Sequence, residues 1–155
     1  MTTSDIEQQW PWTNNGYGSD FVATRTEEDS FSPSHSLKIS KAIIDTAQAH
    51  FWVWYNEYKG EMPFGQDLTL TAKIKGVDLL GPGASIVIRC DRVTQLLQFE
   101  TTENSTNISG SFDWSTYTLN LSDLQSDVTI IRVYLILLPE TTGTVYFDDI
   151  TLTHK

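Results

Sequence analysis

Apolar and polar residues alternate along much of this chain with a period of two. In the segment 67–75, DLTLTAKIK, every second residue is apolar and the residues between are threonine, aspartate or lysine. Successive side chains of a β-strand point to opposite faces, so this pattern predicts a strand with one face in a core. The segments 85–91 and 128–138 alternate in the same way. The second face of 128–138 places Arg132 and Tyr134 between isoleucines, which predicts a sheet face that is only partly covered.

Strand-like runs also occupy most of the remaining sequence. Beyond the three segments above, strands are predicted at 19–26, 35–40, 49–58, 95–101, 115–121 and 143–153. Turn signals separate them, among them Asn14-Asn15-Gly16, Met62-Pro63 and Gly81-Pro82-Gly83. About ten short strands without helical crossovers predict an all-β fold, an antiparallel β-sandwich or barrel. Neither a linker nor a repeat interrupts the sequence, so residues 1–155 are expected to form a single domain.

The composition favours strands and narrows the range of partners. Threonine occurs 20 times and alanine 6 times, and β-branched residues fit a pleated sheet better than a helix. The formal net charge of −10 argues against nucleic acid and anionic membrane surfaces as partners, because both attract lysine and arginine. The N-terminal residues contain no apolar stretch typical of a secretion signal. We therefore expect a cytoplasmic protein, or a secreted domain whose signal has been removed.

Three motifs resemble, in their order and spacing, those of a known group of domains. They are HSLKIS at 35–40, GSFDWSTYTLNL at 110–121 and GTVYFDDITL at 143–152. Together they resemble the β-jelly-roll carbohydrate-binding modules of families four, nine and twenty-two, and the wider galactose-binding-like fold. Such modules typically open with a short Asn/Asp-Phe-Glu motif, to which Asp5-Ile6-Glu7 would correspond, with isoleucine in place of the aromatic residue. The resemblance implies a jelly-roll sandwich that binds a poly- or oligosaccharide and catalyses no reaction.

The run from Phe51 to Tyr55, FWVWY, is the most unusual feature of the sequence. Alternation places its two tryptophans on one face of a strand, about 7 Å apart by the rise per residue. Flat aromatic rings suit the axial C–H face of a sugar, while the sugar hydroxyls need planar polar partners. The resemblance implies a ligand groove across the concave sheet. The residues expected to line this groove are Trp52, Trp54, Arg89, Gln98, Arg132 and Tyr134.

Other interpretations of the aromatic residues remain open. The two tryptophans can instead pack in the core, because large aromatic side chains are core-prone, and the arginines would then be solvated edge residues. A second cluster, Trp10-Pro11-Trp12 with Tyr17, offers a loop-end ligand site, although a first strand that plugs the end of the core is favoured there. Trp114 is expected to pack in the core together with Tyr117.

The same resemblance implies a structural calcium ion that ties the first strand to the last. Carried over residue by residue, it implicates Glu7 and either Asp148 or Asp149 as ligands. By alternation, Asp149 shares a face with Val145 and Phe147 and should point inward. A buried carboxylate needs a partner, which is either calcium or backbone N–H groups.

Signatures of catalysis do not emerge from the sequence, so we expect no enzyme activity. The histidines lack zinc-site spacing, and neither a nucleophile motif nor a phosphate-binding loop is present. The single cysteine, Cys90, lies in the apolar run SIVIRC and is expected to be a buried hydrophobic side chain. The competing function is a structural or protein-interaction sandwich, whose aromatic face docks onto a partner domain or onto a second copy in a homodimer.

Overall fold

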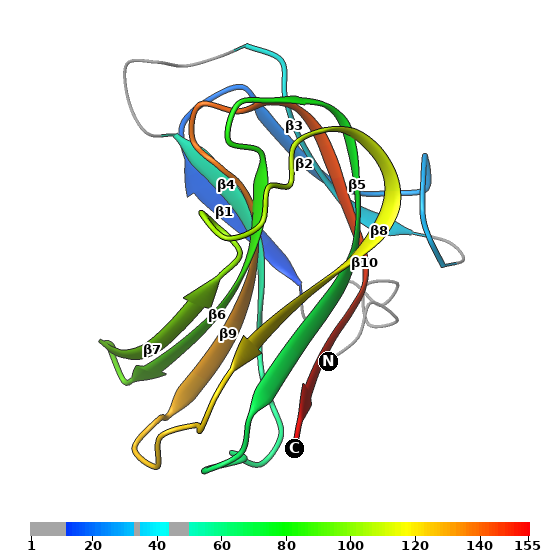
Figure 1. Ribbon diagram of the computed structural model, residues 1–155. Coiled ribbons are helices and arrows are strands. Elements are labelled where there is room, and N and C mark those ends of the chain that lie inside the picture. Colours follow the sequence, from blue (N-terminus) through cyan, green and yellow to red (C-terminus); the bar gives the residue numbers. More distant parts are fainter. Residues whose placement is uncertain (1–11, 33–34, 44–49) are drawn as a thin grey trace.

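The computed structural model describes residues 12–32, 35–43 and 50–155, which form two five-stranded sheets packed face to face (Figure 1). Every pair of neighbouring strands within the sheets is antiparallel. The first sheet, sheet A, contains in spatial order β1 (Thr13–Tyr17), β4 (Phe51–Glu57), β9 (Ile130–Leu137), β6 (Ala84–Arg92) and β7 (Gln95–Thr101). Sheet B contains β2 (Phe21–Thr26), β3 (Ser36–Lys41), β10 (Thr142–His154), β5 (Leu68–Leu80) and β8 (Gly110–Leu121). The predicted all-β, antiparallel jelly-roll sandwich is confirmed. Across the described ranges, none of the elements is an apolar helix of membrane-spanning length.

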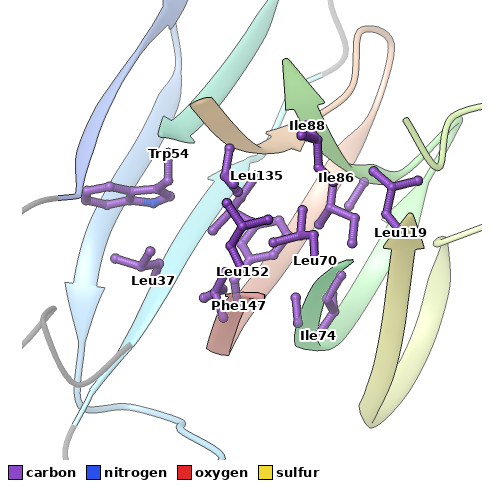
Figure 2. Close-up of a cluster of buried hydrophobic side chains, with 14 of the residues drawn as sticks. Leu37, Trp54, Leu70, Ile74, Ile86, Ile88, Leu119, Leu135, Phe147 and Leu152 are labelled. Carbon is purple, nitrogen blue, oxygen red and sulfur yellow. The ribbon is translucent and has the colours of Figure 1, made fainter. Parts of the chain in front are cut away.

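The core lies between the two sheets and consists of the residues that the alternation places on one face. Leu70 and Ile74 of β5 are fully buried, as are Ile86 of β6 and Leu135 of β9. Figure 2 shows their side chains converging with Phe147 of β10 between the sheets. The opposite face of β9 is half-buried throughout, so its prediction as a partly covered face is confirmed.

The prediction of a turn at Asn14-Asn15-Gly16 is wrong, because these residues form the edge strand β1. Asn14 pairs with Trp54 and Gly16 pairs with Trp52 of β4. An edge strand has one neighbour only, so residues with a weak strand propensity are tolerated there. The two backbones approach so closely that a Cβ atom at Gly16 would lie 2.3 Å from the carbonyl oxygen of Phe51.

A bulge in β10 overturns the expectation that Asp149 points inward. The register against β5 shifts between Asp148 and Thr151, and Asp149 has a positive φ of 47°. An extra residue in a strand interrupts the alternation of side chains. As a result Asp148 is fully buried, whereas Asp149 is partly exposed.

Candidate functional site

A hollow of about 510 Å³ lies on the outer face of sheet A, turned away from the core. All five strands of the sheet contribute to its lining. The lining residues are Asn15, Phe51, Val53, Tyr55, Val87, Arg89, Phe99, Arg132, Tyr134 and Ile136. We call this hollow the outer groove.

The strand register places these side chains in rows that run across the sheet. One row joins Asn15, Val53 and Ile136 on neighbouring strands. The next row joins Tyr55, Tyr134 and Val87. A third row joins Arg132, Arg89 and Phe99. Residues that are directly opposite on adjacent antiparallel strands lie about 5 Å apart, so each row forms a continuous strip of the groove floor.

Aromatic rings occupy the middle and the margins of the outer groove. The rings of Tyr55 and Tyr134 lie 6.0 Å apart between centroids, with an interplanar angle of 34°. Phe51 is 37% exposed and Phe99 is 48% exposed, and each lies toward a different edge of the sheet. Ring faces therefore remain open to a ligand within the groove.

The third row carries the charges of the groove. The Nε atom of Arg89 donates to both carboxylate oxygens of Asp91 at 3.1 Å, and the Asp91 side chain is buried. The Nη2 atom of Arg132 lies 3.3 Å from Glu57, whose other oxygen is 2.7 Å from Lys59 Nζ. Lys59 first, and Arg132 to a smaller extent, lower the pKa of Glu57. Both carboxylates are therefore partners of cations.

The two tryptophans of β4 lie on the opposite face of the sheet from Arg89 and Arg132. Trp54 is only 6% exposed, packs in the core beside Leu37 (Figure 2), and donates its indole N–H to the Lys38 carbonyl at 3.1 Å. Trp52 is partly buried and donates its indole N–H to the side-chain oxygen of Asn14. Its ring also stacks on that of Phe21 of sheet B, 5.4 Å away between centroids. Trp54 thus has the core position that the sequence leaves open as the alternative to a groove position.

Gln98 also lies outside the outer groove. It pairs with Cys90, whose side chain is in the core, so the two share the inner face of sheet A. Its amide group donates to the carbonyls of Ser122 and Asp123, each at 3.2 Å, and accepts from the backbone N–H of Gln125 at 2.9 Å. Gln98 therefore ties down the turn at 122–125.

Of the predicted groove residues, the structure brings Arg89, Arg132 and Tyr134 together. Sequence reasoning did not select Phe51, Tyr55 or Phe99, which line the same hollow. The signal that identifies Tyr55 is the register, because Tyr55 is directly opposite Tyr134. That register is a long-range property and has no counterpart in the alternation of one strand.

The remaining aromatic predictions have mixed outcomes. Trp10 and Pro11 lie outside the described residues, whereas Trp12 is buried, as expected for a residue that plugs the end of the core. The prediction that Trp114 packs in the core is wrong. It lies on the outer face of sheet B against Tyr146 and Phe31, and only Tyr117 packs against the core.

A second hollow, of about 460 Å³, lies at the loop end of the sandwich. It is lined by Pro82, Ala84, Glu103, Asn104, Ser105, Thr106, Asn107 and Leu138. No aromatic side chain is among these lining residues. The outer groove is therefore the better candidate for stacking against a sugar ring.

Asp148 has backbone N–H groups as its partners, which is one of the two possibilities expected for a buried carboxylate. Its Oδ2 atom accepts from the backbone N–H of Phe31 at 2.8 Å and of Ser32 at 3.0 Å. The Ser32 hydroxyl donates to Asp149 Oδ1 at 2.6 Å. Glu7 lies outside the described residues, and the described ones include no group of three or more His, Cys, Asp or Glu side chains that could hold a metal. The Asp148 oxygen that would coordinate a cation accepts hydrogen bonds from these N–H groups instead. Calcium binding therefore stays a prediction of the resemblance.

Comparisons with known proteins identify the fold. No family model matches the sequence, and no curated protein matches it either. Among solved structures, tailspike protein 4 of bacteriophage CBA120 matches with a TM-score of 0.71 and 12% identity, over 98% of this chain and 20% of that one. A cyclase from Fischerella matches with a TM-score of 0.66 and 14% identity, over 93% of this chain and 84% of that one.

Several other matches are carbohydrate-binding modules. The CBM22-1-GH10 part of a Clostridium thermocellum endo-1,4-β-D-xylanase matches with a TM-score of 0.62 and 18% identity, over 93% of this chain and 26% of that one. Modules of families 61, 22 and 11 match with TM-scores of 0.57 to 0.60. The chain thus spans a small part of the tailspike and of the xylanase and most of the separate modules. Identities this low show the fold alone: the chain has the β-sandwich fold found in carbohydrate-binding modules.

Proposed function

We propose that this chain is a non-catalytic carbohydrate-binding module that holds a poly- or oligosaccharide in the outer groove. The observation that carries the proposal is the mixture of side chains on one open sheet face. Exposed aromatic rings lie there beside two arginines and an asparagine. Rings provide apolar faces for sugar C–H groups, and the planar polar groups provide hydrogen bonds for hydroxyls. A flat apolar patch, as expected for protein docking, would lack these polar partners.

Proteins of the same fold support this choice of ligand. One matching structure is a family 61 module in complex with β-1,4-galactotriose, and others are xylan-binding domains of family 22. Each of these modules is covered over most of its length by this chain.

The charges in the groove support binding without catalysis. Glycoside hydrolysis needs a carboxylic acid of raised pKa beside a second carboxylate. Glu57 has the opposite property, because Lys59 and Arg132 lower its pKa. Glu57 is therefore not suited to act as a general acid. Asp91 is buried and is paired with Arg89.

A glycan panel tests the proposal, with isothermal titration calorimetry on every ligand that binds. Phe99→Ala removes an exposed ring of the groove and should raise Kd by about 10- to 100-fold, by analogy with aromatic stacking on nucleobases. Phe64→Ala is a matched control, because Phe64 is 45% exposed, close to the 48% of Phe99, and does not line the groove. Equal effects of the two substitutions would contradict binding in the outer groove.

The competing function, docking of a partner domain or a second copy, predicts a different result. No glycan of the panel would then bind, and sedimentation would show a dimer that Phe99→Ala weakens. A monomer that binds a glycan supports the carbohydrate proposal.

A further inference from the structure

Two arginines stand side by side on the floor of the outer groove. Arg89 of β6 is the direct register partner of Arg132 of β9. Like charges that are directly opposite on neighbouring strands destabilise a sheet. This juxtaposition therefore opposes folding, and no core contact requires it, because both side chains point away from the core.

The neighbouring carboxylates compensate the two arginines only in part. Asp91 accepts from Nε of Arg89 alone, which leaves both terminal amino groups of Arg89 without an acceptor among the described residues. Glu57 is shared between Arg132 and Lys59. The cations Arg89, Arg132 and Lys59 thus pair with two carboxylates, Asp91 and Glu57, in a chain whose formal net charge is −10.

At the Arg89–Asp91 pair, the cation rather than the carboxylate faces an incoming ligand. The Arg89 side chain is 39% exposed, whereas the Asp91 side chain that holds it is only 5% exposed. Guanidinium groups bind carboxylates and related oxyanions through two parallel N–H bonds. Phe99 lies next to Arg89 in the same row and offers a ring for stacking beside the charge.

We infer that the Arg89–Arg132 end of the outer groove is a subsite for an anionic group of the saccharide, either a carboxylate or a sulfate. The inference rests on the proposed carbohydrate-binding function and specifies its ligand as an acidic glycan. The tyrosine row beside it binds the neutral part of the same sugar chain.

The test compares glycans that differ only in charge. Polygalacturonate and alginate are each titrated against their methyl-esterified forms, and a sulfated polysaccharide is titrated against its desulfated form. A chelator is present throughout, so that no divalent cation bridges ligand and protein. We expect at least one charged form to bind about tenfold more tightly than its neutral form, the factor for one hydrogen bond between charged groups. Its Kd should rise steeply as NaCl is raised from about 50 mM to about 500 mM.

Substitutions locate the subsite. Arg132→Gln should abolish the preference for the charged form over the neutral form. Arg92→Gln is the matched control, because Arg92 is exposed at the end of β6 and does not line the groove. If Arg89→Gln fails to fold because buried Asp91 loses its partner, the double variant Arg89→Gln/Asp91→Asn removes both charges together.

The possible results separate this inference from the proposed function. A preference for the charged form over the methyl-esterified form identifies the anionic group as a carboxylate. A preference for the sulfated form over the desulfated form identifies it as a sulfate. Equal binding of charged and neutral forms overturns the subsite and leaves carbohydrate binding in place. An equal loss in Arg92→Gln overturns its location. Binding of no glycan, charged or neutral, overturns the proposed function itself.

Discussion

The face on which a side chain lies decides its role more than its chemical type does. Trp54 and Tyr134 are both aromatic and belong to neighbouring strands of sheet A. Trp54 lies in the core beside Leu37, whereas Tyr134 lines the outer groove. We therefore expect substitutions at these two positions to affect different properties.

Trp54→Ala should lower the free energy of unfolding by about 3–5 kcal/mol, because it leaves a cavity in the core. Tyr134→Ala should cost on the order of 1 kcal/mol or less, the value of a cross-strand pair, here the one with Tyr55. Urea unfolding of both variants measures the difference. Similar losses of stability would contradict the placement of these rings on opposite faces.

Cys90 should be unreactive in the folded protein. It is fully buried, and burial raises the pKa of its thiol to about 12. Because the thiolate is the reactive form, a thiol reagent at about pH 8 should label Cys90 only when the chain opens. Labelling in urea provides the control, and rapid labelling without urea would contradict the burial.

At the scale of elements, the segment 27–32 lies against the outer face of sheet B. Asp29 forms an ion pair with Lys75 of β5 and accepts from the indole N–H of Trp114 at 3.2 Å. Lys73 Nζ lies 4.6 Å from the ring centroid of Phe31. These contacts cover the ring of Trp114 in part, which explains how a tryptophan can remain outside the core.

The ion pair of Asp29 should make the free energy of unfolding depend on pH in the acidic range. The hydrogen bond from Lys75, the largest effect, lowers the pKa of Asp29 in the folded protein. A carboxylate whose pKa is lower in the folded than in the unfolded state stabilises the fold at pH values above its unfolded pKa. This stabilisation is lost as the pH falls through its folded pKa. Asp29→Asn should therefore flatten the fall in stability between about pH 5 and about pH 2. Asp127→Asn, an exposed aspartate in a turn, serves as the control in urea unfolding across this range, and an unchanged slope for Asp29→Asn would contradict the prediction.

Asp148 ties the same segment to β10. Asp148→Ala would leave the backbone N–H groups of Phe31 and Ser32 without their acceptor, and should destabilise the fold by about 1–3 kcal/mol. Asp127→Ala provides a control of the same type, and thermal unfolding measures both. A loss no larger than that of the control would mean that these hydrogen bonds add little.

The predicted calcium ion has a test of its own. A ligand that binds only the folded state raises the melting temperature by mass action. If calcium ties the first strand to the last, adding it after chelation should raise the melting temperature of the natural chain, and less that of Asp148→Asn. A melting temperature that calcium does not change would leave the N–H donors as the partners of Asp148.

At the scale of the whole molecule, most strand pairs join segments that are distant in sequence. Strand β3 pairs with β10, and β5 pairs with β8 and β10 rather than with its successor β6 (Figure 1). Such topology delays folding, because loops must close before the contacts form. We expect refolding on a timescale of about milliseconds to seconds, measured by tryptophan fluorescence in stopped flow. Refolding within microseconds would contradict this expectation.

The sequence by itself determined most of the strands and most of the core. Leu70 and Ile86 are buried where the alternation predicted, because side-chain direction along a strand is a local property with a period of two. Only the tertiary structure decided which face of 51–55 became core, since both faces of that run are bulky and apolar. It alone placed Arg89 opposite Arg132 and buried Asp148 instead of Asp149. Strand partners, register and bulges depend on contacts between distant segments, and those contacts produce no periodic pattern in the sequence.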